Sequence, residues 1–298
     1  MRARPEWLLL LALSAAACGG KDSKAEDPAA ASKKGAEQAA EVVKEPVALI
    51  AGYRPFLAPV DTTKPYVPKR QPVHERAAAA AANEIRHAAN SARQKIRTDW
   101  GPVAGDVQKA LVDVLSACAD ATEDAQFAKC DKSVGALDET LGKAQLTSGV
   151  TFPRLATATP SEASKKAIEK LARAAGPLAA EKTFLAKRAD ASASAADVVN
   201  ACQNAAAEID QIQPDYEKAD EPIRIVAVTH KMNIDAQCHT IGETDDLQKE
   251  VVACKKTPKK HECVETCGKA QARIDEGVPA AAFASLAKDV EASCKKRK

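Results

Sequence analysis

The chain is poor in aromatic residues and has no long apolar segment. Phe, Trp and Tyr make up only 3% of the 298 residues, so a core built on aromatic side chains is excluded. The apolar run from Leu8 to Leu13 is much shorter than the about 20 residues that a membrane-spanning helix needs. No later segment of the sequence comes near that length. The sequence therefore predicts no transmembrane helix in the mature chain.

A concentrated positive charge is also missing. The 43 Lys and Arg residues are nearly balanced by 41 Asp and Glu residues, which leaves a formal net charge of +2. Proteins that bind nucleic acids usually carry a basic stripe, so nucleic acid is excluded as a partner. Two local basic groups, at 255–260 and 295–298, are interpreted as a solvated turn and a solvated helix end. Contact with anionic lipid or polysaccharide is the alternative for both.

Recognisable catalytic and cofactor motifs are absent as well. The sequence contains no G-x-S-x-G nucleophile elbow, no P-loop and no glycine-rich dinucleotide turn. His74-Glu75 begins like the helix of a zinc protease, but Ala78 stands where that motif needs its second histidine. Covalent haem attachment requires C-x-x-C-H, which the chain lacks. We therefore expect no enzyme and no cofactor, although a hydrolase built on two carboxylates would leave little sequence signature.

The amino terminus carries a signal for export. Arg2 and Arg4 precede the apolar run, and the small residues Ala15 to Ala17 lead to Cys18. A basic head, a short apolar stretch and small residues before a cleavage point are typical of a secretory signal peptide. With a cysteine at the first mature position, the segment resembles the signal of a bacterial lipoprotein, although Ala15 stands where that family most often has leucine.

The resemblance implies that residues 1–17 are removed and that the thiol of Cys18 is acylated, usually together with the new amino terminus. The mature protein would then be held to a membrane by lipid alone, since two or more acyl chains give stable anchoring. Gly19 stands where an aspartate is associated with retention at the inner membrane. The resemblance therefore favours the outer membrane, facing the periplasm or the cell exterior. A signal peptide without lipidation, cleaved near Ala17, is the alternative.

Two segments are expected between the signal and the folded part. Residues 18–45 are small and charged, which predicts a disordered tether, because such a composition buries too little apolar surface to offset its ordering entropy. Residues 46–73 contain repeated prolines, which disfavour helix, together with large apolar side chains. This pattern predicts an extended strap along the helical body, with docking to a partner as the alternative.

The rest of the chain has helical periodicity. Apolar residues recur at steps of three and four, and no alternating strand pattern occurs. Thr159-Pro160-Ser161-Glu162 predicts a helix start, and Gly176-Pro177 predicts its end. The sequence therefore predicts an all-α, Ala-rich bundle of helical hairpins braced by disulfides. A break near 147–160 divides it into a helical domain at 74–149 and a Cys-rich helical domain at 159–298.

The cysteines predict the disulfides. Of the nine cysteines, all except Cys18 lie on predicted core stripes between residues 118 and 294. An even number of cysteines in an exported chain indicates a disulfide framework. Residues equidistant from the turn of a helical hairpin face each other, which assigns Cys118 to Cys130 and Cys263 to Cys294. The remaining four are then paired as Cys254–Cys267 and Cys202–Cys238.

Metal binding is the competing interpretation for the carboxyl-terminal cysteines. Cys238-His239, His261, Cys263 and Cys267 offer suitable ligand types. However, their only close pair has the spacing C-x-x-x-C, whereas structural zinc sites usually show C-x-x-C. His230 lies on an apolar stripe, where a hydrogen-bonded core histidine is favoured over a ligand.

Together these features predict a lipid-anchored cell-envelope protein with a structural, adaptor or binding role and no enzymatic activity. Its partners would be the membrane, through the lipid on Cys18, and another envelope protein. A lipoprotein that binds a metal or a small ligand, and an envelope hydrolase with an unrecognised site, are the alternatives.

Overall fold

The computed structural model describes residues 28–59, 72–256 and 261–294, which form helices and their connections without any β-strand. This confirms the predicted all-α fold. The α-helices are α1 (Pro28–Tyr53), α2 (Pro72–Lys95), α3 (Pro102–Ala117), α4 (Asp124–Ser148), α5 (Glu162–Ala175), α6 (Ala179–Ala189), α7 (Ala195–Glu217), α8 (Glu221–Cys254), α9 (His261–Glu276) and α10 (Leu286–Cys294). Short 3-10 helices lie at Arg54–Leu57, Thr98–Trp100 and Ala281–Phe283. None of the described helices combines the length and the apolar composition that crossing a membrane requires.

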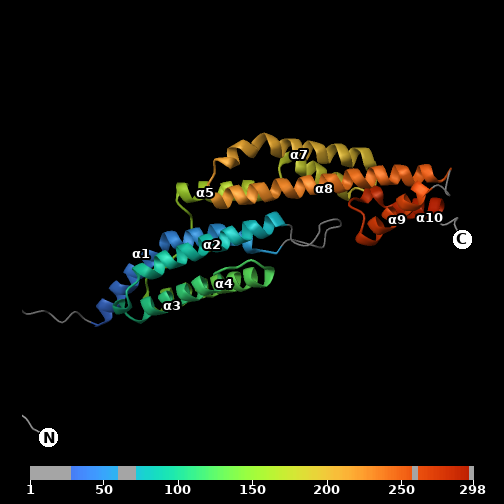
Figure 1. The fold of residues 1–298 in the computed structure, drawn as a ribbon. Helices are drawn as coiled ribbons and strands as arrows, with labels where there is room; N and C mark the ends of the chain where they lie inside the picture. The colour runs from blue at the N-terminus through green and yellow to red at the C-terminus, as the bar shows by residue number, and fades with distance from the viewer. Residues whose placement is uncertain (1–27, 60–71, 257–260, 295–298) are drawn as a thin grey trace, which may run out of the picture.

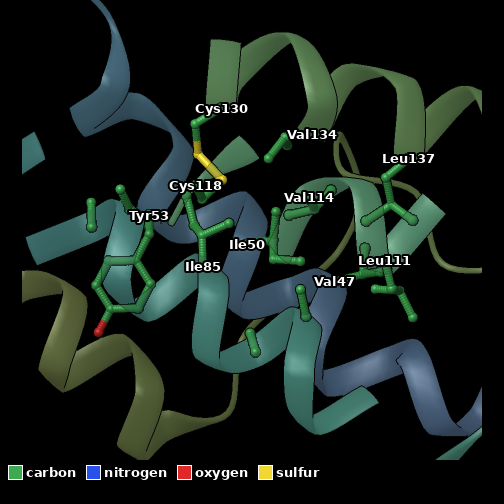
Figure 2. Close-up of a cluster of buried hydrophobic side chains, with 14 of the residues drawn as sticks. Val47, Ile50, Tyr53, Ile85, Leu111, Val114, Cys118, Cys130, Val134 and Leu137 are labelled. Carbon is green, nitrogen blue, oxygen red and sulfur yellow. A yellow bond between two sulfur atoms is a disulfide. The ribbon is translucent and has the colours of Figure 1, made fainter. Parts of the chain in front are cut away.

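Helices α1 to α4 pack around the largest core, which contains many small side chains. A run of alanines supplies most of the buried face of α2. Larger side chains, among them Ile50, Ile85 and Leu111, fill the centre (Figure 2). An alanine buries little apolar area, so the stability of this core depends on close contact between helices.

The segment expected to be a tether and a strap contains a long, buried helix instead. Because α1 covers residues 28–53, the tether predicted at 18–45 and the strap predicted at 46–73 are wrong over this range. Residues 1–27 and 60–71 lie outside the described part of the chain. Pro46 lies inside α1, where it cannot donate a hydrogen bond to the carbonyl of residue 42. Burial outweighs this loss, since one face of α1 has no solvent exposure at Ala36, Ala39, Val43, Val47 and Ile50.

Two glycines explain why α1 is rich in small residues. A Cβ on Gly35 would lie 1.8 Å from the carbonyl oxygen of Trp100, and a Cβ on Gly52 would lie 2.3 Å from Cδ1 of Ile168 on α5. Both distances are shorter than any real contact. At Gly35 the neighbour is backbone, so a side chain would push the segment at Trp100 away, whereas at Gly52 only the flexible end of the Ile168 side chain would have to move. The same small residues that suggested disorder in the sequence allow α1 to pack closely.

Two aspartates that lie seven residues apart on α4, Asp131 and Asp138, hold two connecting segments against the first core. Arg54 donates from Nε to Oδ1 of Asp131 over 2.7 Å, and Arg154 donates from Nη2 to Oδ2 of Asp138 over 2.6 Å. The backbone N–H of Leu155 also donates to Asp138, over 2.8 Å. Gly142 leaves room for the second arginine, because a Cβ there would lie 2.8 Å from Nη1 of Arg154.

Helix α8 is shared by three hydrophobic cores. It has 34 residues, which corresponds to a length of about 51 Å at 1.5 Å per residue. Val226 packs in the first core, Ile234 packs with α6 and α7, and Val251 packs with α9 and α10. The inner residue Leu171 of α5 also belongs to the first core. The predicted division into domains at 74–149 and 159–298 is therefore wrong, because α5 and the start of α8 complete the core of the preceding helices.

The molecule is elongated along α8. Figure 1 shows the start of α1 at one end and the pair α9 and α10 at the other, with α8 running toward that second end. The first core and the α9–α10 pair are therefore far apart on the same rod-like body.

Candidate functional site

Four disulfides join the eight cysteines that lie within the described residues. Cys118 is bonded to Cys130, and Cys202 is bonded to Cys238, as the sequence predicted. The first bond closes the turn between α3 and α4, and its sulfurs lie beside the core (Figure 2). The second bond ties α7 to α8.

The other two predicted pairs are wrong. The structure joins Cys254 to Cys263 and Cys267 to Cys294. The turn between α9 and α10 lies later in the chain than residues 278 and 279, about which Cys263 and Cys294 are symmetric. The connection actually runs from residue 277 to residue 285 and contains a 3-10 helix. Its midpoint lies near residue 281, and Cys267 and Cys294 are almost equidistant from that point.

The disulfides remove the thiolates on which the zinc interpretation depends. Cys254, Cys263 and Cys267 are all oxidised, and metals bind the thiolate form of cysteine. Nowhere in the described ranges do three or more His, Cys, Asp or Glu residues form a group that could hold a metal ion. His239 lies 3.4 Å from Glu243 on the exposed side of α8, far from a closed ligand set.

His230 is buried where α5, α6 and α8 meet, as expected for a core histidine. Its Nε2 lies 2.7 Å from Oε2 of Glu181 on α6, and its Nδ1 lies 3.2 Å from the carbonyl oxygen of Ala174 on α5. The side chains of His230 and Glu181 are only 6% and 7% exposed. Both ring nitrogens are therefore occupied by acceptors, and neither is free to bind a metal.

The hydrogen bonds of His230 determine how many protons the His230–Glu181 pair holds. The carbonyl of Ala174 can only accept, so Nδ1 must carry a proton. A second proton lies between Nε2 and the carboxylate of Glu181, whichever atom holds it. The pair is then neutral as a unit, and this reduces the cost of burying two ionisable groups.

Arg188 on α6 is a second buried polar residue, which the sequence analysis did not predict. Its Nε donates to the carbonyl oxygen of Pro279 over 2.7 Å, and its Nη1 donates to Oε1 of Gln237 over 2.6 Å. No carboxylate of the described residues lies within ion-pair distance, and burial lowers the pKa of Arg188. Lys187-Arg188 looks like the exposed basic last turn of a helix, so periodicity alone could not identify this contact.

An open groove between α3 and α4 bears on the hydrolase alternative. It has a volume of about 360 Å³ and is lined by Asp106 and Asp113 together with Lys109 and Lys143. A glycosidase of the two-carboxylate type needs one carboxyl group that its surroundings keep protonated, typically by burial. All four of these charged side chains are exposed, so this groove lacks the environment of a general acid.

The structure thus brings the eight cysteines and His230 into the folded body, whereas Cys18 and the signal that precedes it lie outside the described residues. No protein family, no curated protein and no solved structure matches the chain.

Proposed function

We propose that this protein is a lipid-anchored component of the cell envelope that acts without catalysis, as an adaptor between a membrane and a second envelope protein. The observation that supports the proposal is the short stretch of sequence between Cys18 and the start of α1, which lies at one end of the elongated helical body. The membrane in question is the outer membrane, facing the periplasm or the cell exterior, as the lipoprotein-like signal favours.

The distance between the lipid and the folded body would be short. Cys18 is separated from Pro28, the first residue of α1, by only nine residues. Ten residue steps span at most about 35 Å. The lipid would therefore hold the start of α1 close to the membrane surface, in place of the long tether that the composition of 18–45 suggested.

The opposite end of the body would then project away from the membrane. The α9–α10 pair lies at the far end of the molecule from the start of α1 (Figure 1). Two disulfides fix this end, one to α8 and one between α9 and α10. Val252 and Val264, each 52% exposed, offer apolar side chains there. A covalently braced, partly apolar end is suited to contact a partner protein.

The anchor is tested by the intact mass and the fractionation of protein from native envelopes. The wild-type chain should carry acyl groups on Cys18 and should stay with the membranes, and Cys18→Ala should be released. A mass without acyl groups, together with release of the wild type, would contradict the anchor.

The adaptor role is tested by a photo-reactive residue placed at Val264 in the full-length protein in intact cells. A discrete cross-linked species should form from Val264 and should not form from Val112, which is 41% exposed on α3 in the first bundle. Cross-linking from Val112 alone, or from neither position, would argue against an adaptor whose far end binds a partner.

A further inference from the structure

The end of the body where α1 starts also gathers the end of α2, the start of α3 and the end of α4 (Figure 1). Trp100, which ends the 3-10 helix after α2, contacts α1 at Gly35 through its carbonyl group. Pro102 begins α3 directly afterwards, and it lines one groove together with Thr147 from the last turn of α4. We call this part of the surface the α1 end and define it as residues 30–37, 93–106 and 143–150.

Basic residues outnumber acidic residues at the α1 end, although the whole chain is nearly balanced in charge. The basic residues are Lys33, Lys34, Arg93, Lys95, Arg97 and Lys143, and the acidic residues are Glu37, Asp99 and Asp106. Asp99 is engaged by Arg97 over 2.7 Å. The four lysines are exposed, and Lys33, Lys95 and Lys143 form no ion pair within the described part of the chain. Their ammonium groups can therefore meet an anionic partner.

The α1 end also presents apolar side chains of the kinds that favour a membrane interface. Leu146, which is 86% exposed, has the most exposed large apolar side chain among the described residues. It lies in the last turn of α4, close to Lys143. The side chain of Trp100 is only partly buried against the first core. Tryptophan is enriched at the boundary between lipid and water, because its ring is apolar and its N–H is polar.

The length of chain before α1 determines what the α1 end can reach. The ten residue steps from Cys18 to Pro28 span at most about 35 Å. Gly35, and with it Trp100, lies about 10 Å further along α1, at 1.5 Å per residue. A lipid on Cys18 would therefore keep this surface at a high effective concentration beside the membrane, so that even a weak contact would be populated.

We propose that the α1 end docks on a membrane surface that carries anionic headgroups. Trp100 and Leu146 enter the interface between lipid and water, and the surrounding lysines contact the headgroup phosphates. The inference rests on the proposed lipid anchor and adds an orientation to it, because docking fixes which face of the body meets the membrane. An acidic protein would attract the same lysines, but the short connection to Cys18 places them beside lipid.

The test uses the fluorescence of Trp100 in the whole mature protein. The sequence has 2 tryptophans, and Trp7 lies in the expected signal, so Trp100 is the only one that remains when residues 1–17 are removed. Protein from native envelopes is reconstituted into vesicles of phosphatidylglycerol and phosphatidylcholine, with bromine on the acyl chains as a short-range quencher. Trp100 should be quenched relative to unbrominated vesicles of the same composition. Vesicles of brominated phosphatidylcholine alone should quench it much less, because they lack net negative charge.

Matched variants test the charged and the apolar contacts. Lys33→Gln together with Lys95→Gln should shift docking about 25-fold toward the undocked state, since each lysine at an anionic surface contributes a factor of about five. Lys166→Gln together with Lys170→Gln removes the same charge from exposed positions on α5 and should change nothing.

Leu146→Ala should weaken docking about tenfold and leave thermal unfolding unchanged. Met232→Ala, at a position 66% exposed on α8, is its control and should leave docking unchanged.

Flotation of the same vesicles separates this inference from the anchor. Protein that floats with the vesicles while Trp100 stays unquenched keeps its anchor and overturns docking. Protein that does not float overturns both. Equal quenching in anionic and neutral vesicles, or an equal loss from the Lys166 and Lys170 control, would overturn docking on anionic headgroups even if the protein floats.

Discussion

Gly35 and Trp100 are in direct backbone contact: a Cβ on Gly35 would lie 1.8 Å from the carbonyl oxygen of Trp100. Gly35 lies on α1, and Trp100 ends the 3-10 helix that precedes α3. A segment that the composition described as a tether is therefore fixed against the body by one of its closest contacts.

Gly35→Ala should destabilise the protein, against the usual effect of such a change. Replacing glycine by alanine within a helix normally stabilises by up to about 1 kcal/mol. At Gly35 the added methyl group would force α1 away from Trp100, and overpacking of this kind costs about 1–3 kcal/mol. The free energy of unfolding in urea should therefore fall. Gly242→Ala on α8, where a Cβ meets nothing within 4 Å, is the control and should raise it. A stabilised Gly35→Ala variant would show that α1 does not pack as described.

The Glu181–His230 pair should respond differently to two substitutions of the same residue. Glu181→Gln keeps a side chain that can donate an N–H to Nε2 of His230, so it should cost about 1 kcal/mol. Glu181→Ala leaves the buried imidazole without its partner and should cost about 3 kcal/mol. Urea unfolding at neutral pH measures both. Equal losses from the two variants would mean that the hydrogen bond at 2.7 Å contributes nothing beyond packing.

Asp138 should make part of the stability sensitive to acid. The hydrogen bond from Arg154 lowers the pKa of Asp138 more than partial burial raises it, and the N–H of Leu155 lowers it further. A carboxyl whose pKa is lower in the folded state stabilises the protein above its unfolded pKa of about 3.9, and this contribution is lost as pH falls through the folded pKa. At pH 6, Asp138→Asn should cost about 1 kcal/mol, since solvent screens the partly exposed Arg154. This difference should shrink as the pH approaches about 2. A difference that stays constant over this range would assign the loss to packing.

Peptide mapping and the stability of cysteine variants should distinguish the two carboxyl-terminal disulfides. Proteolysis without reduction should yield peptides that link Cys254 to Cys263 and Cys267 to Cys294. The second bond spans 27 residues and the first spans 9, so loop-closure entropy gives about 3.6 and about 2.6 kcal/mol, respectively. Replacing both cysteines of a pair by serine should therefore cost more for Cys267 and Cys294. Peptides that link Cys263 to Cys294 would restore the pairing expected from the sequence.

Much of the helical body could be predicted from periodicity, because its signals are local. Gly176-Pro177 marked the end of α5, which stops at Ala175, although its N-cap proved to be Ser161, whose side chain accepts from the N–H of Ser164. The symmetry rule paired Cys118 with Cys130, since a short turn fixes the register of a hairpin. The same rule failed at Cys263 because the 3-10 helix after α9 displaced the turn.

The errors in α1 and at Arg188 have a different origin. The first half of α1 consists of small and charged residues, and only its contacts with Trp100 and α2 show that small size was required there. Arg188 is buried by Gln237 and Pro279, which are distant in sequence. Such features depend on tertiary contacts, which a single sequence does not display.

If the protein is anchored at one end, as proposed, the disulfide between Cys202 and Cys238 has a mechanical consequence. When the far end is pulled, the chain between these cysteines cannot be drawn out, because the bond closes a loop with a sequence separation of 36. Extending that loop would otherwise release about 120 Å of chain. The pulling force passes across the disulfide instead. The part of α7 after Cys202 and the part of α8 before Cys238 therefore carry little of the load. The extension of the protein stays limited even if its other helices unfold.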